Sequence, residues 1–235
     1  MKKYLFLLYG LISYLAFFGT ILYAIGFVGN LVVPKTIDGE PQTSLAAAVL
    51  INASLLLLFA LQHSIMARPA FKRWWTRMIP KELERSSFVL LSSLCLMLLM
   101  WQWQPVGGIV WSVESKTAKD LLFIFYLAGW GIVFISTFLI NHFDLFGLRQ
   151  VWLYFNGNPY TELPFRLPGL YQLVRHPLYL GFLIAFWSTP VMTVAHLLFA
   201  LLTTGYILTA IRFEERDLIT HFGEKYQSYK KWAPM

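Results

Sequence analysis

The sequence predicts an all-α polytopic membrane protein: four transmembrane helices followed by a C-terminal helical hairpin (five to six membrane helices) and a cytoplasmic helical tail. Of its 235 residues, 57% are hydrophobic and only 13% are charged, whereas about 25% of the residues of a soluble domain are charged. Nearly uncharged apolar runs recur that are long enough to cross the ~30 Å hydrocarbon core of a bilayer. The basic residues lie mostly between these runs or at the two ends of the chain.

Four apolar runs predict the first four helices, at about 4–31, 45–66, 87–104 and 119–141. The first of them follows Lys2 and Lys3 and continues to Leu31, which is longer than the roughly 7–15 apolar residues of a signal peptide. We therefore expect a retained helix at the N-terminus.

The last apolar run, residues 178–211, predicts a hairpin. Its 34 residues would form about 51 Å of helix, which is too long for one ordinary crossing. Pro190 lacks a backbone donor and disfavours helix at Thr189, so the run should break there. We expect two segments, about 178–189 and 191–211, with the turn inside the membrane.

The basic residues predict the orientation, because cytoplasmic loops carry an excess of Lys and Arg. Loop 67–86 holds six basic residues against two acidic ones. The N-terminus, this loop, the loop or lid at 142–177 and the tail at 212–235 are therefore placed on the cytoplasmic side of the inner membrane, in a single integral domain. The net charge of +7 is explained by this pattern, so the expected partner is the lipid bilayer, with no nucleic acid and no obligate protein partner.

Polar motifs gather on this predicted cytoplasmic face. Arg-His-Pro-Leu-Tyr-Leu-Gly occupies 175–181, Glu214 and Glu215 follow the hairpin, and FGEKYQSY occupies 222–229. Taken alone, Arg175 could anchor a helix end, and the two glutamates could belong to a solvated helix face. Their joint occurrence in this order favours a binding site.

This combination resembles the integral membrane methyltransferase superfamily, which includes the isoprenylcysteine carboxyl methyltransferases and the phospholipid methyltransferases. The resemblance covers residues 170–234. It implies an S-adenosylmethionine cofactor, bound by the last two membrane helices and the tail. Matching the motifs residue by residue assigns six residues to the cofactor pocket: His176, Pro177, Tyr179, Gly181, Glu214 and Glu215.

The chemistry of this cofactor agrees with the residues at hand. Arg175 or Arg212 can meet its carboxylate, because a guanidinium binds carboxylates in a bidentate way. Glu214 or Glu215 can accept hydrogen bonds from its ammonium or ribose hydroxyls. A helix starting at Pro177 offers free N–H groups, and the ring of Tyr179 can contact a sulfonium or adenine. Gly181 would allow close approach to the backbone.

The rest of the chain narrows the family. The stretches LQHSIMARPAFKRWW (61–75), PKELERSSFVL (80–90) and INHFDLFGLRQVW (140–152) are similar to the methanethiol S-methyltransferase family, with related patterns in NnrU-like membrane proteins. The resemblance implies that a small apolar thiol, methanethiol, is converted to dimethyl sulfide. The attacking species should be the thiolate, so the protein needs a proton acceptor or a strongly stabilising positive field.

The candidate catalytic residues are His63, His142 and Asp144. His142 and Asp144 could converge at the end of the fourth helix, where a carboxylate partner would raise the basicity of the imidazole. Structural roles compete with this hypothesis: an interhelical hydrogen bond for His63, and a helix-end cap or loop contact for His142 and Asp144. For His196, deeper in the hairpin, we expect a structural hydrogen bond. No metal site is expected.

Three alternatives stay open. The first is methylation of a lipid-like thiol, carboxylate or amine, and the second is a membrane reductase with a nicotinamide cofactor. The third is a non-enzymatic NnrU-like membrane protein. A reductase that binds a nicotinamide cofactor with a 2′-phosphate would need an additional basic cluster. The tail contains only Lys225, Lys230 and Lys231.

Overall fold

The computed structural model describes residues 1–235 and is almost entirely α-helical. Five helices are long and apolar enough to cross a membrane: α1 (Lys2–Gly29), α2 (Leu45–Ala67), α4 (Lys81–Gln102), α5 (Lys116–Ile140) and α9 (Val194–Phe222). The predicted all-α polytopic membrane fold is therefore confirmed. The chain forms two compact units, Met1–Val106 with Asn141–Glu162, and Gly107–Ile140 with Leu163–Met235.

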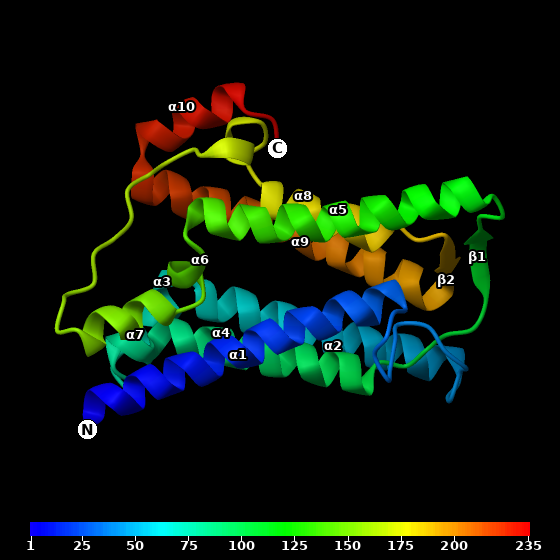
Figure 1. Ribbon diagram of the computed structural model, residues 1–235, viewed down its shortest axis with the longest axis horizontal. Coiled ribbons are helices and arrows are strands. Elements are labelled where there is room, and N and C mark those ends of the chain that lie inside the picture. Colours follow the sequence, from blue (N-terminus) through cyan, green and yellow to red (C-terminus); the bar gives the residue numbers. More distant parts are fainter. The chain divides into compact units, whose positions relative to one another are not determined.

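The first unit is built around α4, which packs against both α1 and α2 (Figure 1). Its facing surface buries small polar side chains, which let membrane helices approach closely: Ser86, Ser87, Ser92 and Ser93. The hydroxyl groups of Tyr9 on α1 and Ser87 lie 3.0 Å apart. The unit is completed by α3 (Pro69–Trp75), α6 (His142–Leu145) and α7 (Leu148–Phe155), of which α7 packs on α1 and α4.

Two glycines permit the close packing of α6 and α7. Gly147 has a φ of +87°, which glycine adopts without steric cost, and it lies against the backbone of Ser86. A Cβ atom on Gly10 would stand 2.5 Å from a methyl carbon of Val151 on α7. Because neither glycine has a side chain, the segment 141–155 can pack closely against α1 and α4.

The second unit combines α5, α8 (Pro177–Trp187), α9 and α10 (Glu224–Trp232) with the short 3-10 turn η1 (Gly169–Gln172) and two strands. The helices α5 and α8 pack along each other. Their contact needs glycine on both sides, because a Cβ atom on Gly129 would lie 2.6 Å from the nitrogen of Ala185, and one on Gly181 would lie 2.7 Å from the Gly129 oxygen. Such small-residue contacts are a common way to join membrane helices.

The hairpin breaks where Pro190 predicts a break. α8 ends at Trp187, and α9 begins at Val194. The chain between them contains β2 (Val191–Thr193), which pairs antiparallel with β1 (Ile109–Ser112). The 11 residues of α8 rise only about 16 Å, so α8 spans about half of the ~30 Å core.

Hydrogen bonds satisfy the interrupted backbone of the hairpin, as a membrane interior requires. The Pro190 carbonyl accepts from the nitrogen of Val113 at 2.9 Å. The Nε2 atom of buried His196 donates to the Phe186 carbonyl at 2.9 Å. The structural hydrogen bond predicted for His196 is confirmed, and it closes the end of α8.

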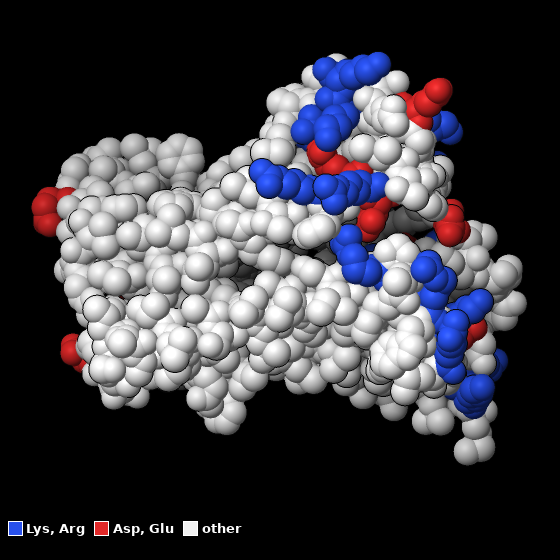
Figure 2. Space-filling view, turned by 180° about the vertical axis from the view of Figure 1, so that it is seen from behind, with Lys and Arg blue, Asp and Glu red and all other residues white.

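Charged side chains avoid the long helix surfaces. Figure 2 shows long uncharged sides, with Lys and Arg gathered on limited parts of the surface. In the first unit the basic residues include Lys2, Lys3, Arg149 and the segment 68–85, and in the second unit they lie mainly in the last part of α9 and in α10. The predicted division into 1–141, 142–177, 178–211 and 212–235, in one domain, stays a prediction.

Candidate functional site

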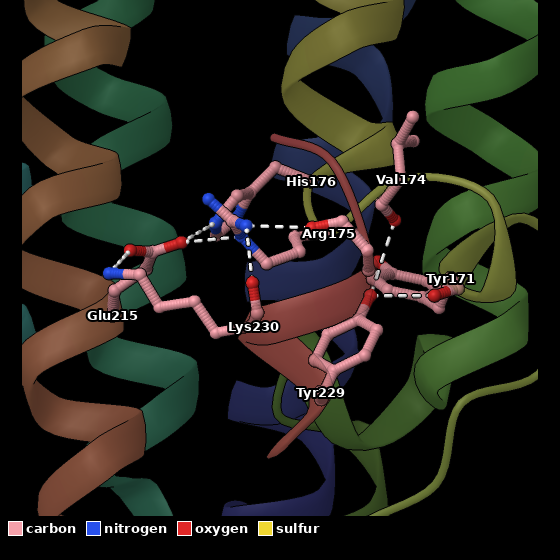
Figure 3. A network of polar contacts seen from close by, with 8 residues as sticks. Tyr171, Val174, Arg175, His176, Glu215, Tyr229 and Lys230 are labelled. Atoms are coloured by element: carbon pink, nitrogen blue, oxygen red, sulfur yellow. Dashed lines mark hydrogen bonds and ion pairs between the residues drawn. The ribbon is translucent and has the colours of Figure 1, made fainter. Parts of the chain in front are cut away.

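A buried carboxylate organises the polar cluster of the second unit. Glu215 on α9 is only 6% exposed, and its Oε1 atom accepts from Arg175 Nε at 2.8 Å. The same oxygen lies 3.3 Å from His176 Nε2, and Oε2 accepts from Lys230 Nζ at 2.5 Å. Figure 3 shows these side chains converging from the start of α8, from α9 and from α10. A buried charge is tolerated only when it is paired in this way.

Arg175 also holds the end of the chain. Its Nη1 atom donates to the carbonyls of Ala233, at 2.7 Å, and Lys230, at 3.2 Å. Its backbone nitrogen donates to the carbonyl of Pro234 at 2.9 Å. Nearby, the Tyr229 hydroxyl donates to the Tyr171 carbonyl at 2.6 Å. The residues after α10 are thereby fastened to the segment that leads into α8.

Glu214 has different surroundings from Glu215. It is half-buried and takes no part in the ion pairs of Glu215, and it hydrogen-bonds the side chain of Tyr179 on α8. Burial, and then the negative charge of Glu214, raise the pKa of Tyr171. This carboxylate therefore faces tyrosine side chains and takes no part in the ion pairs of Glu215.

The other predicted cofactor residues of this unit differ in position. Pro177 is buried at the first position of α8, where its missing N–H costs nothing. Gly181 lies against Gly129 of α5, so its local role is close helix packing. Arg212 is exposed on α9 and forms no hydrogen bond or ion pair with the Glu215 cluster. The cofactor roles of these three residues stay predictions.

In the first unit, His142 is paired with a tyrosine. Its Nε2 atom lies 2.8 Å from the hydroxyl of Tyr14 on α1, and it is buried among the rings of Phe143 and Phe146. Burial lowers the pKa of His142 below its ordinary 6.5, so the imidazole is neutral at pH 7. A neutral imidazole can accept a proton.

Asp144 does not contact His142 but pairs with Arg149. Arg149 Nη1 lies 2.8 Å from Asp144 Oδ1 and also donates to the Thr161 carbonyl at 2.8 Å. The Tyr160 hydroxyl donates to Asp144 Oδ2 at 3.4 Å. The backbone nitrogen of Asp144 donates to the Asn141 side chain, which caps α6. The contacts of Asp144 thus link residues within the segment 141–161. This is the loop contact that competes with a catalytic role for Asp144.

His63 occupies an interhelical position. Its Nδ1 atom lies 3.2 Å from the hydroxyl oxygen of Ser92 on α4, and its ring packs near Phe59 and Phe88. This is the structural contact that the sequence left open beside a catalytic role.

Three residues of these clusters were not foreseen: Tyr14, Arg149 and Lys230. Lys230 carries a signal in retrospect, since it follows the FGEKYQSY motif directly. Tyr14 lies 128 residues before His142, in an apolar helix rich in aromatic residues, and no local pattern distinguishes it.

The fold and the site define the chain as an integral membrane protein. Its short helix α8 starts at a cluster of carboxylate, guanidinium and imidazole groups. No family model matches the chain, and no solved structure matches it. It is 55% identical over 229 residues to the methanethiol S-methyltransferase of Crocosphaera subtropica, covering 97% of this chain and 90% of that protein. It is 51% identical over 235 residues to the methanethiol S-methyltransferase of Mycobacterium tuberculosis, covering 100% and 96%.

A more distant relative is nurim of Mus musculus, 31% identical over 183 residues, which covers 74% of this chain and 70% of that protein. The chain belongs to the methanethiol S-methyltransferase family.

Proposed function

We propose that this chain transfers a methyl group from S-adenosylmethionine to methanethiol and so forms dimethyl sulfide. The observation that carries the proposal is the identity of 51% and 55%, over nearly the full length, to two proteins named methanethiol S-methyltransferase. Methylation of a lipid-like thiol, carboxylate or amine is the alternative within the same reaction class.

The donor set of the second unit fits the cofactor. Bound S-adenosylmethionine would supply an electrophilic methyl group. Glu214, which has no basic partner, would accept from the ammonium or ribose hydroxyls, with the Tyr179 ring beside a cationic group. Arg175 uses Nε and Nη1 within the protein, which leaves Nη2 to donate to the carboxylate. Glu215 would act by holding Arg175 and His176 in place.

His142 is the proposed proton acceptor. Methanethiol must lose its S–H proton before its sulfur can attack, and a positioned base accelerates such a step by about 100-fold or more. The buried imidazole of His142 is neutral at pH 7, and the Tyr14 hydroxyl at 2.8 Å fixes its orientation. The S–H bond would break, its proton would pass to the imidazole, and the thiol sulfur would keep the electron pair for the new bond to the methyl carbon. Bound S-adenosylmethionine would supply that methyl group and leave as S-adenosylhomocysteine, whose sulfur would keep the electron pair of the broken methyl–sulfur bond.

We further propose that the N-terminus, the segment 142–177 and the tail 212–235 face the cytoplasm. The excess of Lys and Arg in and beside these segments supports this orientation. Residues 156–168 contain no helix, and we propose that they act as a lid, in which Arg166 would help to exclude water.

The first test combines binding and turnover. We expect the purified protein to bind S-adenosylhomocysteine, measured by calorimetry in detergent, and to release dimethyl sulfide into the headspace when given methanethiol and S-adenosylmethionine. Binding of S-adenosylhomocysteine without formation of dimethyl sulfide would show that the methyl acceptor is a molecule other than methanethiol. Absence of binding would contradict the cofactor and favour a nicotinamide cofactor or a non-enzymatic role.

A second test separates the proton acceptor from the cofactor residues. We expect both His142→Ala and Asp144→Ala to lower kcat, and His142→Ala to lower it by about 100-fold or more. Both variants should retain the affinity for S-adenosylhomocysteine. The matched controls are His221→Ala and Asp120→Ala, since both residues are exposed. Loss of cofactor affinity in His142→Ala would place His142 in the binding shell instead.

A further inference from the structure

A membrane-level cleft in the first unit lies between α1 and α4 and has no part in the proposed chemistry. It has a volume of about 340 Å³. Gly19 and Tyr23 of α1 line it on one side, and Met97 and Trp101 of α4 line it on the other. Its lining is mostly apolar, and Trp101 at its rim is 70% exposed, as is usual for a tryptophan at a membrane boundary.

The cleft runs from the end of α1 toward the middle of the membrane. Gly19 precedes the last residue of α1, Gly29, by ten residues, which is about 15 Å of helix. A Cβ atom on Gly19 would meet nothing within 4 Å, so the missing side chain leaves the cleft open at this depth. The shape and lining suit a hydrocarbon chain that lies along the helices.

A single cation stands at the mouth of the cleft. Lys35 follows α1, and its Nζ atom donates to the Trp101 carbonyl at the end of α4. It forms no ion pair, and Asp38, three residues further on, accepts from the Asn30 side chain at 2.7 Å. Burial lowers the pKa of Lys35, which is the response of an ammonium that lacks a nearby anion.

We propose that this cleft binds one anionic phospholipid, with its phosphate against Lys35 and an acyl chain between α1 and α4. The ammonium supplies the charge that a phosphate group complements, and the apolar lining with the open position at Gly19 supplies the groove for the chain. The site is independent of methyl transfer and lies at the end of α1 opposite to Lys2 and Lys3.

Native mass spectrometry of the detergent-purified chain tests this site, with phosphatidylglycerol and phosphatidylcholine titrated separately. We expect the wild type to retain one phosphatidylglycerol about fivefold more tightly than phosphatidylcholine, the effect of one basic residue at a membrane surface. Lys35→Gln should remove this preference. Gly19→Leu should fill the cleft and weaken the binding of both lipids.

The matched control is Gly131→Leu on α5, where a Cβ atom also meets nothing within 4 Å. It should bind both lipids as the wild type does. Equal binding of the two lipids by the wild type, or phosphatidylglycerol binding that is unchanged in both Gly19→Leu and Lys35→Gln, would overturn the proposal. If Gly19→Leu does not fold, Lys35→Gln decides alone.

Discussion

Replacing Glu215 by alanine should abolish tight cofactor binding and destabilise the second unit. The side chain is buried and contacts three groups that carry or can carry positive charge: Arg175, His176 and Lys230. Removing one partner of a buried ion pair costs about 3–5 kcal/mol, because the remaining charges lose their compensation. Thermal unfolding and S-adenosylhomocysteine calorimetry measure the two effects.

The matched control for Glu215→Ala is Glu224→Ala, because Glu224 is exposed at the start of α10. It should leave both the melting temperature and the affinity unchanged. In Glu215→Ala the affinity for S-adenosylhomocysteine should fall by more than about tenfold, or ~1.4 kcal/mol. Wild-type affinity in Glu215→Ala would exclude the role of Glu215 in holding Arg175 and His176.

Replacing Gly181 by alanine should separate α5 from α8. The added Cβ atom would lie 2.7 Å from the Gly129 oxygen and 2.9 Å from the Val133 nitrogen, and these backbone atoms cannot move aside singly. Overpacking of this kind costs about 1–3 kcal/mol or more, which outweighs the ~1 kcal/mol by which alanine otherwise favours a helix over glycine. The free energy of unfolding should therefore decrease.

Gly131→Ala on α5 is the control, because its Cβ atom would meet nothing within 4 Å. Here the helix propensity acts alone, and stability should stay the same or rise by up to ~1 kcal/mol. If Gly181→Ala keeps wild-type stability but loses affinity for S-adenosylhomocysteine, the glycine serves the cofactor and not the packing.

Much of the fold follows from local sequence. Apolar runs located the ends of the first four membrane helices to within three residues, apart from the start of α4, and Pro190 marks the break in the hairpin. The start of α4 was placed at 87 and lies at Lys81, because Lys81–Arg85 are good helix formers that hydropathy alone does not count. The pairing of Ile109 with Thr193 joins residues far apart in sequence and leaves no local pattern.

In the polar clusters, too, local sequence predicts some contacts, and contacts between distant segments are not predictable from it. Arg175, His176 and Glu215 lie together, because the hairpin returns the chain to the level of its own start; their cofactor roles stay predictions. Their exact hydrogen bonds were not predictable from the sequence. Lys230 donates to one carboxylate oxygen of Glu215, and the Ala233 carbonyl accepts from the guanidinium of Arg175. The contact of His142 with Tyr14 instead of Asp144 depends on helix packing that spacing along the chain does not encode.

The shortness of α8 has a consequence for biogenesis. Its 11 residues are too few to be retained in a bilayer as an independent segment, which takes about 20. Its partner α5, with Gly129, lies earlier in the chain, and so does β1, which pairs with the strand β2 that follows α8; both are synthesised first. We therefore expect α8 to enter the membrane together with α9, on a surface that α5 and β1 have already prepared.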